Sequence, residues 1–546
     1  MKKLSELTAL AAACALTAVT FCSCGAKENL SSQSDYSIYE YAGDAESEDY
    51  YEAEESAGDN SWNRENSNVS VEKPSANEKY VGYEETGFKD PETEPLSTFS
   101  ADVDTASYSN IRRIIEDGQA VPEDAVRIEE IINYFDYDYP EPENGEVFGR
   151  YAEIADCPWN SSAKLMMIGI QGKRMEQAET PPSNLVFLID SSGSMSDYNK
   201  LPLVQTAFSM LAENLTVKDR ISIVTYANSS RTVIDGVPGS EKDTILEGLY
   251  SINAGGGTNG EGGIERAYEL AEEYFIKGGN NRVIIATDGD LNIGASTGEE
   301  LTELIESKRD KGIYLSVLGF GTGNLNDENL EALADNGNGN YSYIDSVDEA
   351  ERVLVQEMSG TIYTIAKDVK IQVEFNPSQV KSYRLIGYDN RIMNAEDFRD
   401  NIKDAGEVGA GHSVTALYEI VLADSPASYN GIELEFADQH QQETTVPQND
   451  NRRTELCKLS VAYKDIDTNE DVYLSALFGM EKYSEIPTPA IQLAGAAAEF
   501  GMILRDSQYK GNSDFDYVTE QLMKIANNEK TEEFLSLSKT AAALYE

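Results

Sequence analysis

The chain has 546 residues, with 97 aspartates and glutamates against 43 lysines and arginines, which gives a formal net charge of -54. This excess of negative charge argues against binding to nucleic acid and against electrostatic docking on an anionic membrane, because both surfaces are themselves negatively charged. The length is sufficient for two to four domains once terminal segments of unusual composition are set aside.

Residues 1–24 have the pattern of an export signal. Lys2 and Lys3 precede an apolar run over residues 7–21, which is short for a membrane span. The run ends in Phe-Cys-Ser-Cys-Gly, which resembles the cleavage site of bacterial lipoproteins, with Cys24 as the lipidated residue. The resemblance implies an exported protein that is anchored to a bacterial membrane by its lipid alone. A plain secretory signal with incidental cysteines is the alternative.

Residues 25–92 are predicted to form a disordered acidic tether. The stretch 35–60 is dense in Asp, Glu, Tyr, Ser and Gly and has almost no aliphatic residues. Such a segment cannot bury enough apolar surface to offset the entropy cost of ordering it. A binding motif built on the interleaved tyrosines is the alternative to a solvated spacer.

Residues 93–180 form the next region, in which two helices and two strands are expected. Isoleucines at helical spacing predict helices over 105–116 and 126–134, and apolar runs predict strands over 149–155 and 164–172. Three aspartates in this region are candidates either for a second metal site or for helix caps and solvated turns, and we favour the latter. They are Asp102, Asp104 and Asp136.

Residues 181–360 alternate between strand and helix patterns, which predicts an α/β fold with a doubly wound, mostly parallel sheet covered on both faces. Strands are expected over 185–189, 220–226, 231–234, 282–288, 313–320 and 341–344. Helices are expected over 201–215, 240–252, 262–276, 299–311, 327–334 and 347–358. Ser240-Glu241-Lys242-Asp243 has the form of a capping box at the start of one helix.

Five oxygen-bearing side chains are expected at one edge of this sheet, because ligand sites form outside the carboxyl ends of parallel strands. They are Asp190, Ser192, Ser194, Thr258 and Asp288. Carboxylate and hydroxyl oxygens suit a hard divalent cation such as Mg²⁺. A Ser/Gly turn is the alternative for residues 190–194 alone. A phosphate loop is the alternative for the glycines of AGGGTNG, but no lysine follows at the required spacing.

Aspartate, two serines, threonine and aspartate on three successive loops resemble the metal-ion-dependent adhesion site of the von Willebrand factor type A domain. The resemblance implies that the hydroxyls ligate the metal directly and that the aspartates act largely through bound waters. It also implies that a carboxylate of a partner protein completes the metal's coordination. Asp290 follows Asp288 closely, and it either helps to hold a ligating water or caps the loop.

Residues 361–480 are predicted to be rich in strands, and residues 481–546 to be helical. The strands are expected over 368–375, 383–386, 414–422 and 455–463, and the helices over 491–504, 515–526 and 531–544. Neither flank of the α/β domain has enough strands for a core of its own. We therefore expect the strands of both flanks to form one all-β unit, into which the α/β domain is inserted with its ends close together.

Two further observations concern the flanks. The stretches SADVDTASYSNIRR, RIEEIINYFDYDYP, SYRLIGYDNR and DAGEVGAGHSVTALYEI resemble the regions that flank the type A domain in a family of bacterial lipoproteins. The resemblance covers about residues 95–544. Cys157 and Cys457 are candidates for a disulfide across the two flanks, and the alternative is two buried, small apolar side chains.

The histidine content argues against a hydrolase. Only His412 and His440 are present, and no nucleophile elbow or zinc pair is found. We expect His412 to be a structural residue. The predicted function is that of a lipoprotein of the cell envelope that binds a partner protein through Mg²⁺. The alternatives are an assembly or signalling subunit of the envelope, which a neighbouring ATPase or sigma-factor gene would favour, and a hydrolase.

Overall fold

The computed structural model describes residues 73–75, 77–175, 180–258, 260–289, 298–357, 360, 362–400, 403–426, 454–466 and 468–545. The predictions on the signal peptide, Cys24, Asp290 and His440, and on the tether stretch 35–60, lie outside these residues. No helix of the described part is long and apolar enough to cross a membrane.

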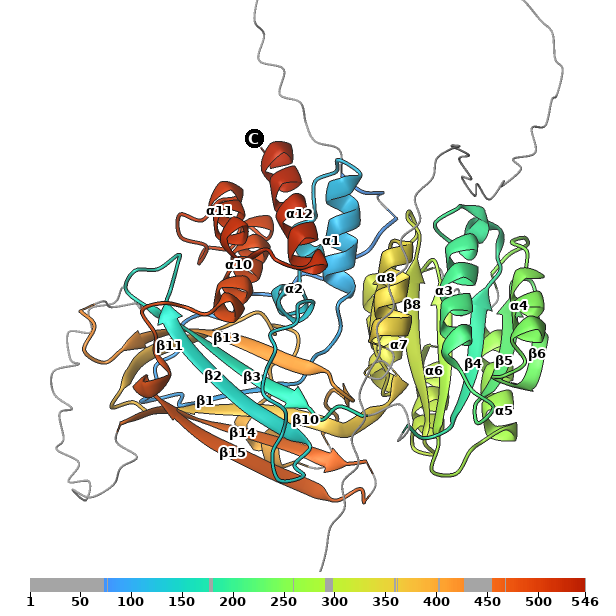
Figure 1. Ribbon diagram of the computed structural model, residues 1–546, viewed down its shortest axis with the longest axis horizontal. Helices are drawn as coiled ribbons and strands as arrows, with labels where there is room; N and C mark the ends of the chain where they lie inside the picture. The colour runs from blue at the N-terminus through green and yellow to red at the C-terminus, as the bar shows by residue number, and fades with distance from the viewer. Residues whose placement is uncertain are drawn as a thin grey trace, which may run out of the picture. The chain divides into compact units, whose positions relative to one another are not determined.

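An α/β domain lies in the middle of the described chain (Figure 1). Its sheet has the strand order β6-β5-β4-β7-β8-β9, with all neighbours parallel except β5 and β6. The strands are β4 (Ser183–Asp190), β5 (Arg220–Tyr226), β6 (Ser230–Pro238), β7 (Asn280–Thr287), β8 (Ile313–Phe320) and β9 (Tyr341–Ile344). The helices are α3 (Leu201–Asn214), α4 (Lys242–Tyr250), α5 (Glu261–Glu273), α6 (Gly298–Arg309), α7 (Asp327–Asn336) and α8 (Val347–Glu351). The predicted doubly wound fold is confirmed.

Alternate residues of β4 face opposite sides of this sheet, and both sides are covered. Phe187 stacks on Phe208 of α3, with ring centroids 4.2 Å apart. Val186 and Leu188 instead belong to a core with residues of α5 and α6. Burial on both faces explains why the central strands are continuous apolar runs in the sequence.

Two ends of helices differ from the prediction. The capping box at residues 240–243 is wrong, because Glu241 is the N-cap of α4 and makes no side-chain capping bond. The last helix of the domain does not continue regularly to residue 358. It changes at Arg352 to a π-helical turn, Arg352–Gln356, where the buried Arg352 hydrogen-bonds to Thr105 outside the domain.

Strands from both sides of the α/β domain form two further sheets. One has the order β1-β10-β14-β15, with β12 also paired to β10, and the other has the order β11-β13-β3-β2, all antiparallel. The strands of the first are β1 (Leu96–Ser100), β10 (Thr364–Phe375), β12 (Val408–Gly409), β14 (Glu455–Asp465) and β15 (Asp471–Gly479). Those of the second are β2 (Phe148–Asp156), β3 (Lys164–Gly172), β11 (Val380–Ile386) and β13 (Ser413–Leu422).

These two sheets share one apolar core, as shown by the edge-to-face pair of Phe375 on β10 and Tyr418 on β13 at 5.1 Å. The α/β domain is therefore an insertion in an all-β unit, as predicted. Its ends lie close together, because the Ser183 hydroxyl is hydrogen-bonded to the Tyr363 hydroxyl at 3.3 Å.

Five helices pack together beside the sheet that contains β3 and β13 (Figure 1). They are α1 (Ala106–Glu116), α2 (Ile128–Asn133), α10 (Pro489–Leu504), α11 (Phe515–Ile525) and α12 (Glu529–Tyr545). Their core includes Phe135, Phe500 and Phe534, and it also takes in Leu165 and Leu417 from the sheet. The predicted helical C-terminal part is confirmed.

The predicted disulfide between Cys157 and Cys457 is not formed, because both cysteines are free and buried. Cys457 lies in the core shared by the two β-sheets, whereas Cys157 lies in the core under the helices. The alternative prediction, two buried and small apolar side chains, is the one that the structure supports.

The end of the predicted tether is also corrected. Lys79 donates its backbone NH to the Leu325 carbonyl at 2.9 Å, and Lys89 exchanges backbone hydrogen bonds with Tyr383. Phe88 packs against the helical core. Residues 78–92 thus belong to the folded part, because their backbone pairs with Leu325 and Tyr383 and Phe88 contributes to the helical core.

Candidate metal site

Asp190 and Asp288 lie at the carboxyl ends of neighbouring parallel strands. Asp190 is the last residue of β4, and Asp288 directly follows β7. The register pairs Ile189 with Ala286, so that Asp190 lies beside Thr287, whose hydroxyl donates to the Asp190 Oδ2 at 3.4 Å. Both carboxylates are fully buried, with 0% of each residue exposed.

The loop after β4 turns back over these carboxylates. The backbone NH of Ser192 donates to the Asp190 Oδ1 at 2.8 Å, which fixes the start of the loop. The hydroxyls of Ser192 and Ser194 are 3.0 Å apart, with Ser194 in a short 3-10 turn, η2 (Gly193–Ser196). Two hydroxyl oxygens are therefore side by side next to a buried carboxylate.

The glycine-rich loop before α5 is held against this turn by two backbone hydrogen bonds. Gly255 donates to the Ser191 carbonyl at 2.8 Å, and Gly193 donates to the Gly256 carbonyl at 3.0 Å. Gly256 has φ +92, in the left-handed region that favours glycine. Thr258 follows two residues later and is partly exposed. The three predicted loops thus meet at one edge of the sheet.

Asp288 carries the observation that points to a cation. Its Oδ2 accepts a hydrogen bond from Lys200 Nζ at 2.9 Å. Its Oδ1 is buried and has no hydrogen-bond partner in the part of the chain that the structure describes. An unsatisfied buried carboxylate oxygen is costly. With two hydroxyls and a second carboxylate nearby, the donor set fits a hard divalent ion, held directly or through water.

Burial governs the ionisation of the site. It raises the pKa of Asp190 to about 6, and repulsion from Asp288 acts in the same direction, while hydrogen bonds from Ser192 oppose it. Burial also raises the pKa of Tyr226 well above its ordinary value, with Asp190 the strongest charged neighbour. A cation in the site would favour the ionised form of Asp190.

Three residues of this site were not predicted from the sequence. They are Lys200, Tyr226 and Thr287. Tyr226 ends a predicted strand, and Thr287 lies one residue before the end of another at the same edge as the aspartates, so strand order alone was a signal for them. Lys200 gave none, because a lysine before an apolar helix is ordinarily solvated.

The three aspartates of the N-terminal region do not form a second metal site. Asp136 is largely exposed and pairs with Lys530 at 2.9 Å. Asp102 and Asp104 are buried, and they pair with Arg391 at 2.9 and 3.7 Å. The preferred prediction, helix caps and solvated turns, is also wrong for these two: both are buried, and Thr105 is the N-cap of α1. Oxygens of Asp102, Glu130 and Glu331 do approach within 4.8 Å of one another, and each of these carboxylates pairs with Arg127 or Arg391.

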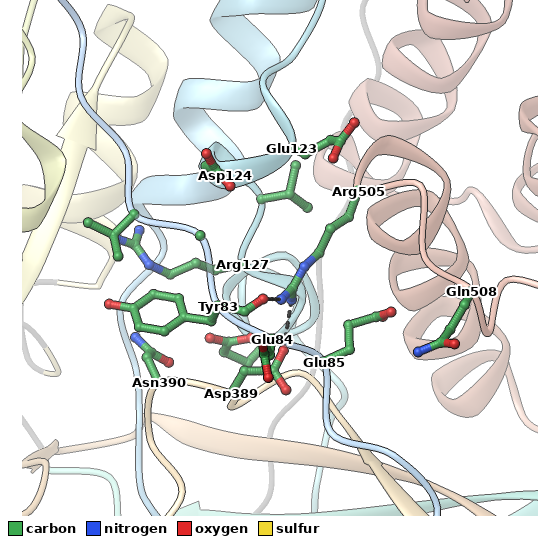
Figure 2. Close-up of a pocket in the computed structure, with 14 residues that line it drawn as sticks. Tyr83, Glu84, Glu85, Glu123, Asp124, Arg127, Asp389, Asn390, Arg505 and Gln508 are labelled. Atoms are coloured by element: carbon green, nitrogen blue, oxygen red, sulfur yellow. Dashed lines mark hydrogen bonds and ion pairs between the residues drawn. The ribbon is translucent and has the colours of Figure 1, made fainter.

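A separate cavity of about 400 Å³ lies among the N-terminal segment, α2 and the end of α10 (Figure 2). Arg505 reaches into it, donating to Asp389 at 2.7 Å and to the Tyr83 carbonyl. Arg127, at the other side, is paired with Asp327 and Glu331. The cavity shares no lining residue with the candidate metal site, and its two arginines are already committed to partners.

The described histidine does not belong to the candidate site. His412 lines a cavity with Glu357, Asp136 and Lys530, and none of the five predicted metal ligands lines it. Burial lowers the pKa of His412, and its Nδ1 is buried without a partner among the described residues. In the described part of the chain, the hydroxyls of Ser192 and Ser194 thus have no imidazole base beside them. The burial of His412 away from the five predicted ligands agrees with the prediction of a structural residue.

Comparisons with known proteins agree with this architecture. Three family models match the chain: "von Willebrand factor" over residues 74–167, "von Willebrand factor type A domain" over 184–357, and "Uncharacterized protein YfbK, C-terminal" over 360–544. The second of these spans the α/β domain with all five predicted ligands. The third begins where the inserted domain ends.

Similar proteins were found in bacteria and among solved structures. Uncharacterized protein YfbK of Escherichia coli (strain K12) is 38% identical over 449 residues, covering 81% of this chain and 76% of that protein. Uncharacterized protein sll0103 of Synechocystis sp. is 29% identical, covering 38% of this chain and 49% of that protein. The structure of von Willebrand factor type A from Catenulispora acidiphila has 13% identity and a TM-score of 0.40, covering 74% and 91% of the respective chains. The chain therefore belongs to the YfbK family of von Willebrand factor type A domain proteins.

Proposed function

We propose that this chain is a lipid-anchored protein of the cell envelope that binds a partner protein through a divalent cation. Five side chains would hold the ion, which we expect to be Mg²⁺: Asp190, Ser192, Ser194, Thr258 and Asp288. The observation that carries this proposal is the buried Asp288 Oδ1, which has no partner among the described residues beside a buried aspartate and two adjacent hydroxyls. Type A domains mediate protein–protein interaction, which agrees with the family of this chain.

The chemistry of the donors supports capture of an acidic group. Three of the five donors are neutral hydroxyls, so the negative charge of the donor set comes from Asp190 and Asp288 alone. A cation held by these donors would accept a carboxylate oxygen of a partner in place of one water. The chain's own groups support the site: the Ser192 NH holds the Asp190 carboxylate, and backbone hydrogen bonds hold the glycine-rich loop that precedes Thr258 against the serine turn.

The surface beside the site offers a place for further contacts with the partner. Asp197, Tyr198 and Asn199 directly follow the serine turn, and they line a cavity of about 520 Å³ with residues of α1 and α12. Tyr198 is 86% exposed, and exposed aromatic side chains are frequent anchors of protein interfaces. We propose that this cavity contributes to the choice of partner.

The first experiment measures binding of Mg²⁺ by isothermal titration calorimetry. The wild type is expected to bind the ion, and Asp190→Ala is expected to abolish binding while leaving the circular dichroism spectrum unchanged. Asp197→Ala is the matched control, since this exposed carboxylate lies just beyond the serine turn. Equal heats from the wild type and Asp190→Ala would refute the assignment.

The second experiment tests capture of a partner. The protein is immobilised, exposed to a membrane extract in Mg²⁺ or in EDTA, and the bound proteins are identified by mass spectrometry. A specific partner should be retained in Mg²⁺ by the wild type and by Asp243→Ala, a control at an exposed carboxylate of α4, and lost in EDTA or with Asp190→Ala. Retention that ignores both the chelator and the substitution would contradict metal-dependent binding.

The lipid anchor is proposed from the sequence of the export signal. Cys24→Ser is expected to move the protein from the detergent phase to the aqueous phase in a phase-partitioning assay, whereas Cys22→Ser is expected to leave it in the detergent phase. Equal partitioning of the two variants would remove Cys24 as the lipidated residue.

A further inference from the structure

We propose that Lys200 is a fixed positive charge in the metal site. This charge weakens binding of the divalent cation and strengthens the attraction of the bound cation for a carboxylate. This inference rests on the proposed function, because it concerns the same site. It states that one lysine sets both the affinity for the metal and the affinity of the bound metal for the partner.

Lys200 is buried at the site and makes a close ion pair. Its Nζ lies 2.9 Å from the Asp288 Oδ2, and the side chains of Lys200 and Asp288 are 4% and 0% exposed. The pair leaves the Asp288 Oδ1 as the oxygen without a described partner. The carboxylate is thus divided, with one oxygen on the lysine and the other available to a cation or its water.

The position of Lys200 is fixed by the fold rather than by Asp288 alone. Its NH donates to the Asp197 carbonyl at 3.0 Å, and its carbonyl accepts from Val204 at the start of α3. Its aliphatic stem lies on Gly321, where an added Cβ would approach the Lys200 Cγ to 2.3 Å. Gly321 also has φ +70, and its carbonyl accepts from the Tyr343 hydroxyl at 2.6 Å. The backbone hydrogen bonds of Lys200 and the packing of its stem on Gly321 therefore hold the ammonium group at the site.

The charges of the buried groups explain why the lysine matters. Asp190 and Asp288 together supply two negative charges when ionised, and Lys200 supplies one positive charge. A divalent cation then brings the site to a net charge of about +1, whereas without the lysine the same ion would be neutralised. Because these groups are buried, water screens their interactions only weakly.

Two opposite effects follow from this balance. Repulsion between Lys200 and the divalent ion weakens metal binding, because both cations share the Asp288 carboxylate. The uncompensated charge then strengthens binding of an anionic group to the ion. Lys200 thus favours binding of a partner's carboxylate and disfavours binding of the metal.

The first test compares Mg²⁺ binding by the full chain and its variants in isothermal titration calorimetry. Lys200→Met keeps an apolar stem on Gly321 and removes the charge, and we expect it to bind Mg²⁺ about tenfold more tightly. Lys200→Arg keeps the charge and is expected to stay near the wild type. Lys218→Met is the matched control, an exposed lysine of the same domain. If Lys200→Met does not fold, Lys200→Gln replaces it.

The second test uses Mn²⁺ as a paramagnetic probe and acetate as the carboxylate. Acetate that displaces water from the bound ion lowers the water proton relaxation rate. The acetate concentration at half effect should rise about tenfold in Lys200→Met relative to the wild type and Lys218→Met. This readout distinguishes the proposal from a purely structural role of Lys200, because loss of a structural role would weaken the binding of both the metal and acetate.

The outcomes separate this inference from the proposed function. If the wild type does not bind Mg²⁺ at all, the proposed function itself fails. If the wild type and Lys200→Met bind Mg²⁺ equally, or if the variant binds it more weakly, the metal site stands and the role assigned to Lys200 is overturned.

Discussion

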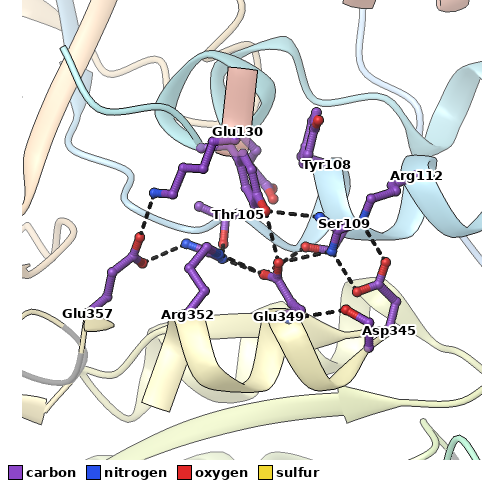
Figure 3. Close-up of polar contacts among 12 residues, drawn as sticks. Thr105, Tyr108, Ser109, Arg112, Glu130, Asp345, Glu349, Arg352 and Glu357 are labelled. Atoms are coloured by element: carbon purple, nitrogen blue, oxygen red, sulfur yellow. Dashed lines mark hydrogen bonds and ion pairs between the residues drawn. The ribbon is translucent and has the colours of Figure 1, made fainter. Parts of the chain in front are cut away.

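Arg112 of α1 and Asp345, the residue after β9, form a bidentate ion pair across the junction between the N-terminal region and the α/β domain. The Arg112 Nε and Nη2 donate to the two carboxylate oxygens at 2.7 and 2.6 Å. The same guanidinium also donates to Glu349 of α8 at 2.9 Å (Figure 3). All three side chains are at least nine-tenths buried. The inserted domain is thus held by charge pairs as well as by its two chain connections.

Arg112→Met is expected to lower the free energy of unfolding by about 3–5 kcal/mol, because it leaves the buried Asp345 without its counter-ion and the buried Glu349 with Arg352 alone. Urea unfolding followed by circular dichroism measures the change. Arg266→Met is the control, since its pair with Glu269 is partly exposed, and it should cost less than about 1 kcal/mol. Similar losses from the two substitutions would contradict the importance of burial at this junction.

Binding of Mg²⁺ is expected to weaken as the pH falls below about 6. Burial raises the pKa of Asp190 to about 6 in the metal-free protein, so protons compete with the cation for this carboxylate. Between pH 7.5 and pH 5 the affinity should fall about tenfold, and calorimetric titration at several pH values measures it. An affinity that does not change over this range would show that Asp190 stays ionised without metal.

Glu499 in α10 is predicted to make stability decline with rising pH. Burial raises its pKa to about 7, and its Oε2 has no hydrogen-bond partner among the described residues. The folded state therefore binds the proton more tightly than the unfolded state, and stability is lost as the pH rises from about 4.5 through 7.

Glu499→Gln should remove this dependence and stabilise the protein by about 3 kcal/mol at pH 8 while changing little at pH 4.5. Urea unfolding at the two pH values measures the difference. Glu520→Gln on the exposed face of α11 is the control. A gain that is the same at both pH values would point to a cause other than the ionisation of Glu499.

The isolated α/β domain, residues 181–363, is expected to fold and to bind Mg²⁺ with the affinity of the full chain. Its ends already meet at the hydrogen bond between Ser183 and Tyr363, and all five proposed ligands and Lys200 lie within it. Its melting temperature should be lower, because Asp345 and Glu349 lose Arg112. Thermal denaturation and calorimetry test both points, and an unfolded fragment would show that the flanks are required.

The central strands of the α/β domain were predicted from the sequence with nearly correct ends, because strands buried on both faces are apolar runs between polar loops. The edge strand β15 was missed, since its residues alternate between exposed and partly buried positions and it reads as a mixed segment. Strand β1 was missed as well, because LSTFS is short and mostly polar, although the structure buries it.

The candidate site was predictable as far as strand order determines it. Asp190 and Asp288 end strands that the alternation of elements makes neighbours, so their meeting needed no further information. The pair of Lys200 and Asp288 was not predictable, because it depends on the rotation of α3 and on the backbone of Gly321 more than a hundred residues away. The disulfide failed for a similar reason: sequence does not show that Cys157 and Cys457 belong to different cores.

The insertion of the α/β domain also sets the order of events during synthesis. Strand β3 leaves the ribosome before the whole inserted domain, yet its neighbour β13 comes after it. At ordinary translation rates this delay is on the order of ten seconds or more. The hairpin of β2 and β3 therefore has an unpaired edge throughout that time, and the second sheet is completed only after the inserted domain has been made.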